Sequence, residues 1–100
     1  MSSEFETIKE KIIIEKDYLK TTYGVQKIGV FGSFVRGEQT LESDIDVAVL
    51  FDKNAEVGIS KYFGLQDYLS EKLGRKIDLV TENSIRPAFR KYILPTIFYI

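Results

Sequence analysis

The chain has 100 residues, of which 44% are hydrophobic and 29% charged, and a length of this order predicts one domain spanning residues 1–100. Fourteen basic residues against fifteen acidic ones leave a net charge of -1, which disfavours general attraction to the phosphate backbone of nucleic acids. Neither cysteine nor histidine occurs, so disulfides, thiolate nucleophiles, serine–histidine triads and imidazole metal sites are excluded. Any chemistry must use carboxylates, hydroxyls, Lys, Arg, backbone amides and a bound cation.

The sequence carries no sign of a targeting or membrane-spanning segment. The start MSSEFETIKEK has no basic region followed by an apolar one, as a signal peptide would. The apolar runs are far shorter than the ~20 residues that cross a bilayer. We therefore expect a cytoplasmic protein with no membrane partner.

The first predicted element is a helix that ends at Gly24. Ser3 and Glu6 have the spacing of a capping box at its start. Its apolar positions follow near-helical spacing: Phe5, Ile8, Ile12, Leu19 and Tyr23. A β-branched run at 25–31, bounded by Gly24 and Gly32, then predicts the first strand.

Strict alternation predicts a second strand over 44–51. One face holds Ile45, Val47, Val49 and Phe51, and the other holds Asp44, Asp46, Ala48 and Leu50. Further along, spacing predicts a helix over 59–73, with Tyr62, Gln66, Leu69 and Leu73 on one face and Gly74 as its stop.

The C-terminal third predicts a third strand over 76–81 and a last helix. Asn83 or Ser84 can cap that helix, Pro87 is tolerated in its first turn, and Pro95 should break or kink it. It carries Phe89, Tyr92, Ile93 and Leu94. This order of elements predicts an α/β (α+β) fold, a small sheet of three or more strands with helices on one face.

Gly32 and Ser33 are the first residues that suggest chemistry. A glycine leaving a strand, followed by a serine that opens a helical turn, presents backbone N–H groups and a hydroxyl to an anion. The alternative is a plain strand-to-helix turn in which Ser33 is the N-cap.

Asp44 and Asp46 form an acidic pair on the second predicted strand. Side chains two residues apart on a strand point the same way, with Cα atoms about 6.5–7 Å apart. Two carboxylates about 6 Å apart repel by roughly 3 kcal/mol at an effective dielectric near 20, so a cation would relieve them. Oxygen ligands favour a hard ion such as Mg²⁺ or Mn²⁺. The alternative is a solvated face of an edge strand.

Asp78 can join this pair. Its neighbours Ile77 and Leu79 should point to the opposite face of the third strand. If that strand lies beside the second one, three carboxylates meet on one face of the sheet. A surface aspartate on a short edge strand is the alternative.

The spacing of these features resembles a known signature. Gly32-Ser33, ten residues and then Asp44-x-Asp46 is similar to the nucleotidyltransferase superfamily that includes DNA polymerase beta and kanamycin nucleotidyltransferase. GSFVRGEQTLESDIDVAV resembles more narrowly the minimal nucleotidyltransferase (MNT) proteins, whose common form is GSxARGxxxxxSDIDLxV. The segments KIDLVT and IRPAFRKYIL extend the similarity over most of the chain.

The resemblance implies a role for each matched residue. Gly32 and Ser33 would hold the β- and γ-phosphates of a nucleoside triphosphate, and Arg36 would contact phosphate or form a structural salt bridge. Asp44 and Asp46 would bind one or two Mg²⁺ ions, and Asp78 would be the third ligand and a base. Ser43 would orient the aspartate loop, whereas Glu38 and Glu42 would be solvated.

The resemblance also implies an activity, transfer of AMP from ATP to a hydroxyl. MNT proteins commonly act as antitoxins that adenylylate a tyrosine of a HEPN-family toxin, which would be the partner here. Two alternatives stay open: a non-catalytic antitoxin that masks its toxin, and a small-molecule nucleotidyltransferase of the aminoglycoside-modifying kind. Direct nucleic-acid binding ranks last, given the balanced charge.

The C-terminal tail departs from the family pattern. It reads ILPTIFYI where relatives usually continue a helix with an acidic residue. We expect Pro95 to leave Ile97, Phe98 and Ile100 exposed, as an apolar patch that a partner would cover.

Overall fold

The computed structural model describes residues 3–100, and the side chains from Glu4 onward. The helices are α1 (Ser3–Tyr23), α2 (Ser33–Arg36), α3 (Ile59–Leu73) and α4 (Pro87–Ile93), and the strands are β1 (Val25–Phe31), β2 (Ile45–Phe51), β3 (Ile77–Thr81) and β4 (Phe98–Tyr99). Two 3₁₀ turns, η1 (Glu82–Ser84) and η2 (Leu94–Thr96), flank α4. The predicted cap at Ser3 lies outside the described side chains. Within residues 3–100, no helix is both long and apolar enough to cross a bilayer.

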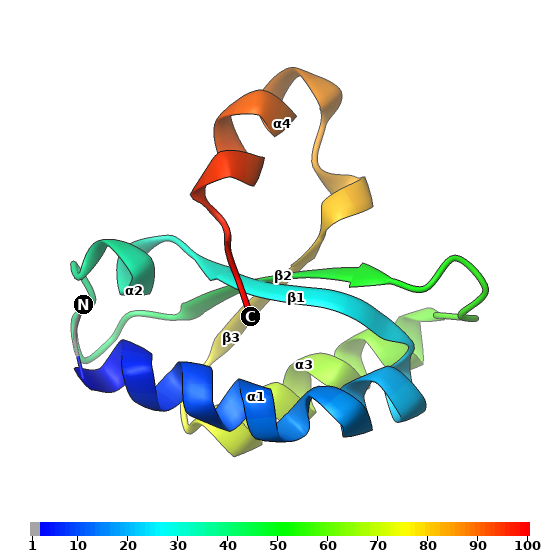
Figure 1. Cartoon of the computed structure of the whole chain (residues 1–100), viewed down its shortest axis with the longest axis horizontal. Coiled ribbons are helices and arrows are strands. Elements are labelled where there is room, and N and C mark those ends of the chain that lie inside the picture. Colours follow the sequence, from blue (N-terminus) through cyan, green and yellow to red (C-terminus); the bar gives the residue numbers. More distant parts are fainter. Residues whose placement is uncertain (1–2) are drawn as a thin grey trace.

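The four strands form one mixed sheet in the order β3-β2-β1-β4. Strand β1 is antiparallel to both β2 and β4, whereas β2 and β3 are parallel because α3 carries the chain back between them. Figure 1 shows α1 and α3 side by side under one face of this sheet, and α4 rising from the other face. The predicted α/β class and small mixed sheet are therefore confirmed, with α1 and α3 on one face as expected, whereas α4 stands on the other face.

The core lies between the sheet and the two long helices. Alternation along β2 places Ile45, Val47 and Val49 in it, as predicted, and Asp46 on the opposite face. Helix α3 contributes mainly leucines, because Leu65, Leu69 and Leu73 fall on one side of it. We refer to the face of the sheet away from α1 and α3 as the open face.

The last helix begins later than the sequence predicted. Neither Asn83 nor Ser84 caps it, since both belong to the turn η1. Arg86 precedes a proline, which holds its backbone extended (ψ 138°), so α4 begins at Pro87. Pro95 ends the helix as predicted, but α4 stops one residue early, at Ile93, because Leu94 and Pro95 belong to the following 3₁₀ turn.

The prediction of an exposed apolar tail is wrong in part, because the tail returns to the sheet. Phe98 and Tyr99 form β4 along β1, and the Ile100 N–H donates to the Ile28 carbonyl at 2.9 Å. Ile97 is only 8% exposed. It packs where β1 has Gly29, at which a Cβ atom would overlap the Ile97 side chain. Phe98 is exposed, as predicted, and Ile100 packs against the core.

Candidate functional site

Two of the predicted carboxylates lie next to each other on the open face. In the parallel ladder between β2 and β3, Asp46 is the direct partner of Asp78. Both alternate with buried residues, so both side chains point away from α1 and α3. The condition on which Asp78 would join the acidic pair, that its strand lies beside the second one, is therefore met.

The surroundings of this pair raise the pKa of Asp46 above its ordinary value. Burial is the largest cause, and Asp78 adds to it through its charge and a side-chain hydrogen bond. The charge of Asp44 raises the pKa of Asp46 further, whereas Arg36 lowers it. The site thus concentrates negative charge that a proton or a cation can neutralise.

Gly32 brings the turn after β1 against the same carboxylate. The end of β1 pairs with β2, with Phe31 opposite Asp46. Gly32 has φ 78° and ψ -148°, a conformation that side chains rarely adopt, and a Cβ atom there would overlap Asp46 Oδ2. A glycine is therefore required at this position for two reasons.

Ser33 is the first residue of α2, not its N-cap. The N-cap is Gly32, whose carbonyl accepts hydrogen bonds from the N–H groups of Val35 and Arg36, both at 3.2 Å. The N-cap alternative for Ser33 is therefore wrong. Its hydroxyl stands at the start of a turn that lies beside Asp46.

Arg36 lies at the end of α2 and forms an ion pair. Its Nε atom donates to Glu38 Oε2 at 3.1 Å, and both side chains are about 60% exposed (59% and 61%). Glu38 is therefore ion-paired in addition to being solvated as predicted. Exposed pairs contribute roughly 0–1 kcal/mol, so Arg36 can exchange this partner for a phosphate at small cost.

Asp44 lies in the loop before β2. The sequence predicted that this strand begins at Asp44, but it begins one residue later, at Ile45. Ser43 orders this loop: its Oγ atom accepts a hydrogen bond from the Thr40 N–H at 2.8 Å. The predicted orienting function of Ser43 thus has a structural counterpart.

Arg75 is the residue that sequence reasoning missed. From the turn between α3 and β3, its Nη1 atom donates to the carbonyls of Thr40, Leu41 and Ser43 at 2.8–3.1 Å. Its Nη2 atom donates to Glu4 Oε2 at 2.6 Å. Arg75 therefore fixes the loop that leads to Asp44, and no local pattern in the sequence could have indicated contacts over such separations.

The chemistry of the Asp46–Asp78 pair fits a divalent cation, since hard cations prefer carboxylate oxygens and would replace the proton that the pair attracts. The complete predicted ligand set is not gathered, however. Across residues 3–100, no three acidic side chains are arranged to hold a metal ion. Asp44 acts on Asp46 by its charge but does not close a three-carboxylate cage.

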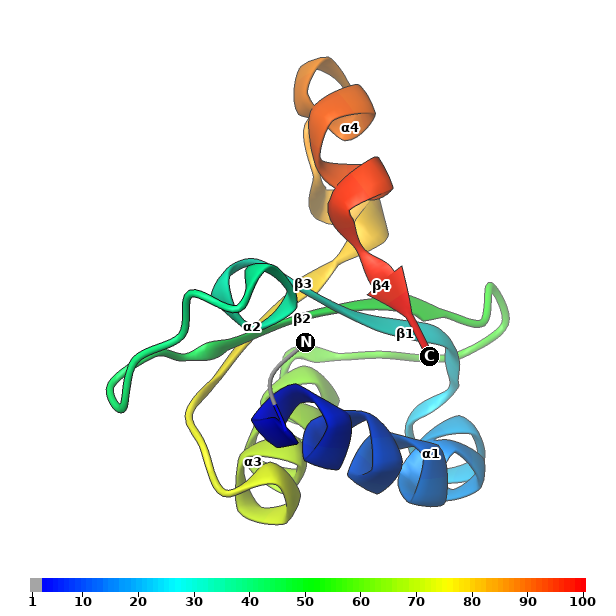
Figure 2. The same cartoon turned by 60° about the vertical axis from the view of Figure 1, so that its left-hand side comes forward.

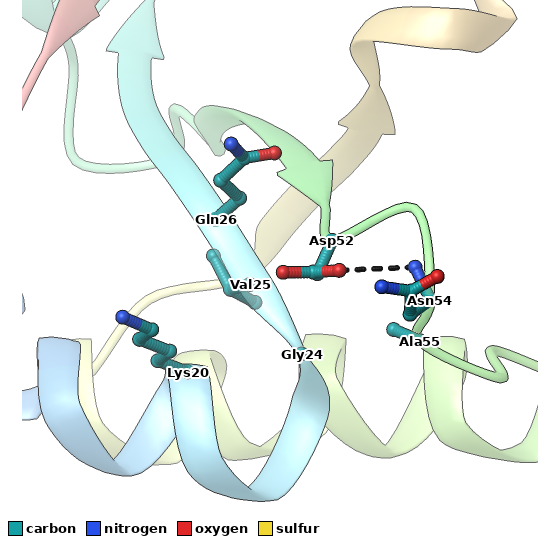
Figure 3. A pocket seen from close by; sticks show the side chains of 7 residues that line it. All are labelled: Lys20, Gly24, Val25, Gln26, Asp52, Asn54 and Ala55. Atoms are coloured by element: carbon teal, nitrogen blue, oxygen red, sulfur yellow. Dashed lines mark hydrogen bonds between the residues drawn. The ribbon is translucent and has the colours of Figure 1, made fainter.

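A sizeable cavity lies elsewhere, at the opposite end of the β1–β2 ladder. It has a volume of about 430 Å³ and lies around Lys20, Gly24, Asp52 and Asn54 (Figure 3). Asp52 Oδ1 accepts a hydrogen bond from the Asn54 N–H at 2.9 Å, so its carboxylate already orders the local turn. We place the candidate site at the paired carboxylates because several reactive groups meet there, not because the surface is hollow.

Comparison with known proteins identifies the family of the chain. A family model described as "Nucleotidyltransferase domain" matches residues 12–96. A provisionally named protein adenylyltransferase of Methanocaldococcus jannaschii is 46% identical over 94 residues, covering 93% of this chain and 94% of the relative. The protein adenylyltransferase MntA of Thermococcus cleftensis is 36% identical over 95 residues, covering 95% and 94%.

Solved structures of two related proteins have the same fold. A provisionally named minimal nucleotidyltransferase superposes with a TM-score of 0.78 at 28% identity, covering 94% of this chain and 93% of that one. A toxin–antitoxin complex with AMP-PNP contains a chain that superposes with a TM-score of 0.70 at 27% identity. That alignment covers 91% of this chain and 70% of its neighbour.

Proposed function

The chain belongs to the nucleotidyltransferase domain family, within its minimal, MntA-like branch, and we propose that it transfers AMP from ATP to a tyrosine hydroxyl of a partner toxin with Mg²⁺. The observation that carries this proposal is the meeting of Gly32, Asp46 and Asp78 on the open face. The enzymatic class follows from the family, as the sequence predicted. The metal, the acceptor and the function of each residue are proposed.

The proposed metal ligands are the paired Asp46 and Asp78. Asp44, which acts on Asp46 only by its charge in this structure, would have to turn toward the pair to become the third ligand. When bound, a divalent cation supplies positive charge that neutralises the triphosphate and the departing pyrophosphate. Mn²⁺ would serve in the same way because it prefers the same oxygen ligands. The raised pKa of Asp46 supports this assignment, since its causes, burial first and then the charge of Asp78, both disfavour a carboxylate that no cation neutralises.

The proposed nucleotide contacts come from α2 and the turn before it. The Ser33 hydroxyl and the N–H groups near Gly32 would hold the β- and γ-phosphates, and Arg36 would leave Glu38 to contact phosphate. Transfer of a nucleotidyl group needs little from side chains beyond positioning and charge compensation. That requirement suits a chain with neither histidine nor cysteine.

The proposed reaction joins the acceptor oxygen to the α-phosphorus of ATP. A bond forms between the tyrosine oxygen and phosphorus, the bond from the α-phosphorus to the bridging oxygen breaks, and pyrophosphate leaves. The hydroxyl proton passes to a carboxylate, for which Asp78 is available because it is exposed on the open face.

The choice of acceptor and partner rests on the relatives. They are named protein adenylyltransferases, and one structural neighbour is part of a toxin–antitoxin complex. The proposed partner is a HEPN-family toxin, as the resemblance to minimal nucleotidyltransferases implies, and modification of that toxin is the proposed antitoxin activity. AMP-PNP in the neighbouring complex supports ATP as the donor.

The test is transfer of label from α-labelled ATP to a HEPN toxin of the same host, with Mg²⁺. We expect one labelled tyrosine-containing peptide with the native protein and none with Asp46→Asn. Asp67→Asn is the matched control, because Asp67 is exposed on α3 and its loss changes the charge equally. Labelling that persists in Asp46→Asn would contradict the proposed site.

Toxin neutralisation separates catalysis from masking. If the toxin stays neutralised by Asp46→Asn and the complex still forms, the protein acts by masking. If neutralisation disappears while the complex remains, it acts by modification.

A further inference from the structure

A second surface of the chain has no function assigned by the site described above. Residues 83–97 form an arch that leaves the sheet at η1, continues through α4 and η2, and returns to β4. Figures 1 and 2 both show this arch standing on the open face, on the side away from α1 and α3. The paired carboxylates point to that same side.

The arch exposes an aromatic face. Helix α4 has no buried residue, and Phe89 and Tyr92 are 52% and 66% exposed. These two rings are three positions apart on the helix and so lie on one side of it. A helix of one or two turns that buries no side chain is not stable by itself, so contacts with other parts of the chain must stabilise it.

Contacts at the base of the arch supply that support. The Tyr99 hydroxyl donates to the buried Glu82 carboxylate, which joins the strand that ends the arch to the turn that begins it. Arg90 donates to the carbonyls of Ile85 and Glu82 at 3.2 and 3.3 Å. The arch is thus held at its base, while its outer face makes no contribution to the core.

The charge of the arch differs from that of the rest of the chain. It contains Arg86, Arg90 and Lys91 and no acidic residue, so it carries +3 in a chain whose net charge is -1. Arg86 and Lys91 are exposed, and the Lys91 ammonium lies 5.1 Å from the centre of the Tyr92 ring. Aromatic and arginine residues are the types that contribute most to protein interfaces.

We propose that the outer face of the arch binds an acidic segment of the acceptor protein and so presents its tyrosine to the open face. This inference rests on the proposed function, because it names the acceptor by its chemistry. The cations Arg86 and Lys91 would pair with carboxylates of that segment, and Phe89 and Tyr92 would pack on its apolar side chains. The arch therefore selects the acceptor, while the carboxylate site performs the transfer.

A protein acceptor explains the arch better than an RNA does. Cations and aromatic rings together can also bind single-stranded RNA, but such sites form grooves along which several phosphates are neutralised. Here the exposed cations are Arg86, which precedes α4, and Lys91, which lies between the two rings in the sequence, and the remainder of the chain is negative. RNA binding is therefore an outcome that the experiment must test.

The experiment measures binding by fluorescence anisotropy, which does not depend on catalysis. The probe is a labelled random copolymer of glutamate and tyrosine, compared with a lysine–tyrosine copolymer and an oligouridine. Arg86→Glu with Lys91→Glu is the test variant. Lys11→Glu with Lys20→Glu is the matched control, because both lysines are exposed on α1, on the other face of the sheet, and the charge change is equal.

We expect the native protein to bind the glutamate–tyrosine copolymer more tightly than the other two probes. The arch variant should bind this copolymer at least ten-fold more weakly than the native protein, and the α1 control should bind it with nearly unchanged affinity. Phe89→Ala with Tyr92→Ala should also weaken binding, with no loss of melting temperature. Equal binding by both charge variants, or tighter binding of the oligouridine or the lysine copolymer, would overturn the inference. If the copolymer binds to the arch but no label passes from ATP to the HEPN toxin, the proposed tyrosine activity is refuted and the docking surface stands.

Discussion

Replacing Asp46 by asparagine should make the metal-free protein more stable. Asp46 and Asp78 are direct partners on neighbouring strands, whose backbones are about 4.8 Å apart. Two charges about 5 Å apart repel by about 3 kcal/mol at an effective dielectric near 20. Because both side chains are partly solvated, screening reduces this to about 1 kcal/mol. We therefore expect Asp46→Asn to raise the free energy of unfolding by about 1 kcal/mol at pH 7.

The effect should depend on pH in a definite direction. The folded state raises the pKa of Asp46 above its ordinary value of 3.8, so the folded chain binds this proton more tightly than the unfolded chain does. The tighter binding of this proton contributes fully to the free energy of unfolding below pH 3.8, and the contribution is lost as the pH rises through the pKa of Asp46 in the folded chain. The native protein and Asp46→Asn should thus be similar near pH 3.5 and differ increasingly above it.

Urea unfolding in EDTA, from pH 3.5 to 7.5, measures both effects, with Asp67→Asn as the control. For a chain of this length, 1 kcal/mol corresponds to a melting temperature about 4–8 °C higher. Mg²⁺ should then stabilise the native protein and not Asp46→Asn. A destabilised Asp46→Asn in EDTA, or a difference that does not change with pH, would refute the argument from repulsion and assign Asp46 a structural function.

Three further substitutions test the turn and the loop around the site. Gly32→Ala should lower the free energy of unfolding by about 1–3 kcal/mol, since its φ and the overlap with Asp46 both oppose a side chain, and near-native stability in urea would show that the turn adapts. Ser33→Ala should weaken calorimetric binding of an ATP analogue about ten-fold, through loss of one hydrogen bond to a charged group, whereas unchanged affinity would restrict Ser33 to starting α2. Arg75→Ala should cost about 2 kcal/mol in urea unfolding, because three loop carbonyls and Glu4 lose their donor, and Arg75→Lys should recover only part of it.

Most of the fold could be predicted because its elements bury one face with a regular period. The long helices and the second strand follow this rule, and Gly24 and Gly74 end α1 and α3 as expected. Asp78 could be placed beside Asp46 only on the condition that β2 and β3 are neighbours, since local pattern contains no information on strand order.

The C-terminal arch could not be predicted by the same reasoning. Strand β4 has two residues, too few for a period, and it forms because Gly29 leaves room for Ile97 on β1. The later start of α4 could have been predicted, because helical backbone is disfavoured for a residue that precedes a proline, and Arg86 precedes Pro87. Arg75 was not, since its partners are 32–71 residues away.

The carboxylate site and the outer face of the arch both lie on the open face, but they are held in place by different parts of the structure. Their functions can therefore be separated by substitution. The carboxylate site is positioned by the sheet, so its geometry is as rigid as the core beneath it. Helix α4 buries no residue and the arch is held at its base, where Ile97 packs against Gly29, so the outer residues of the arch can change with little effect on folding. Acceptor choice can therefore vary among such chains while the transfer site stays fixed. Exchanging residues 83–97 between two relatives should accordingly exchange their acceptors and leave nucleotide binding unaltered.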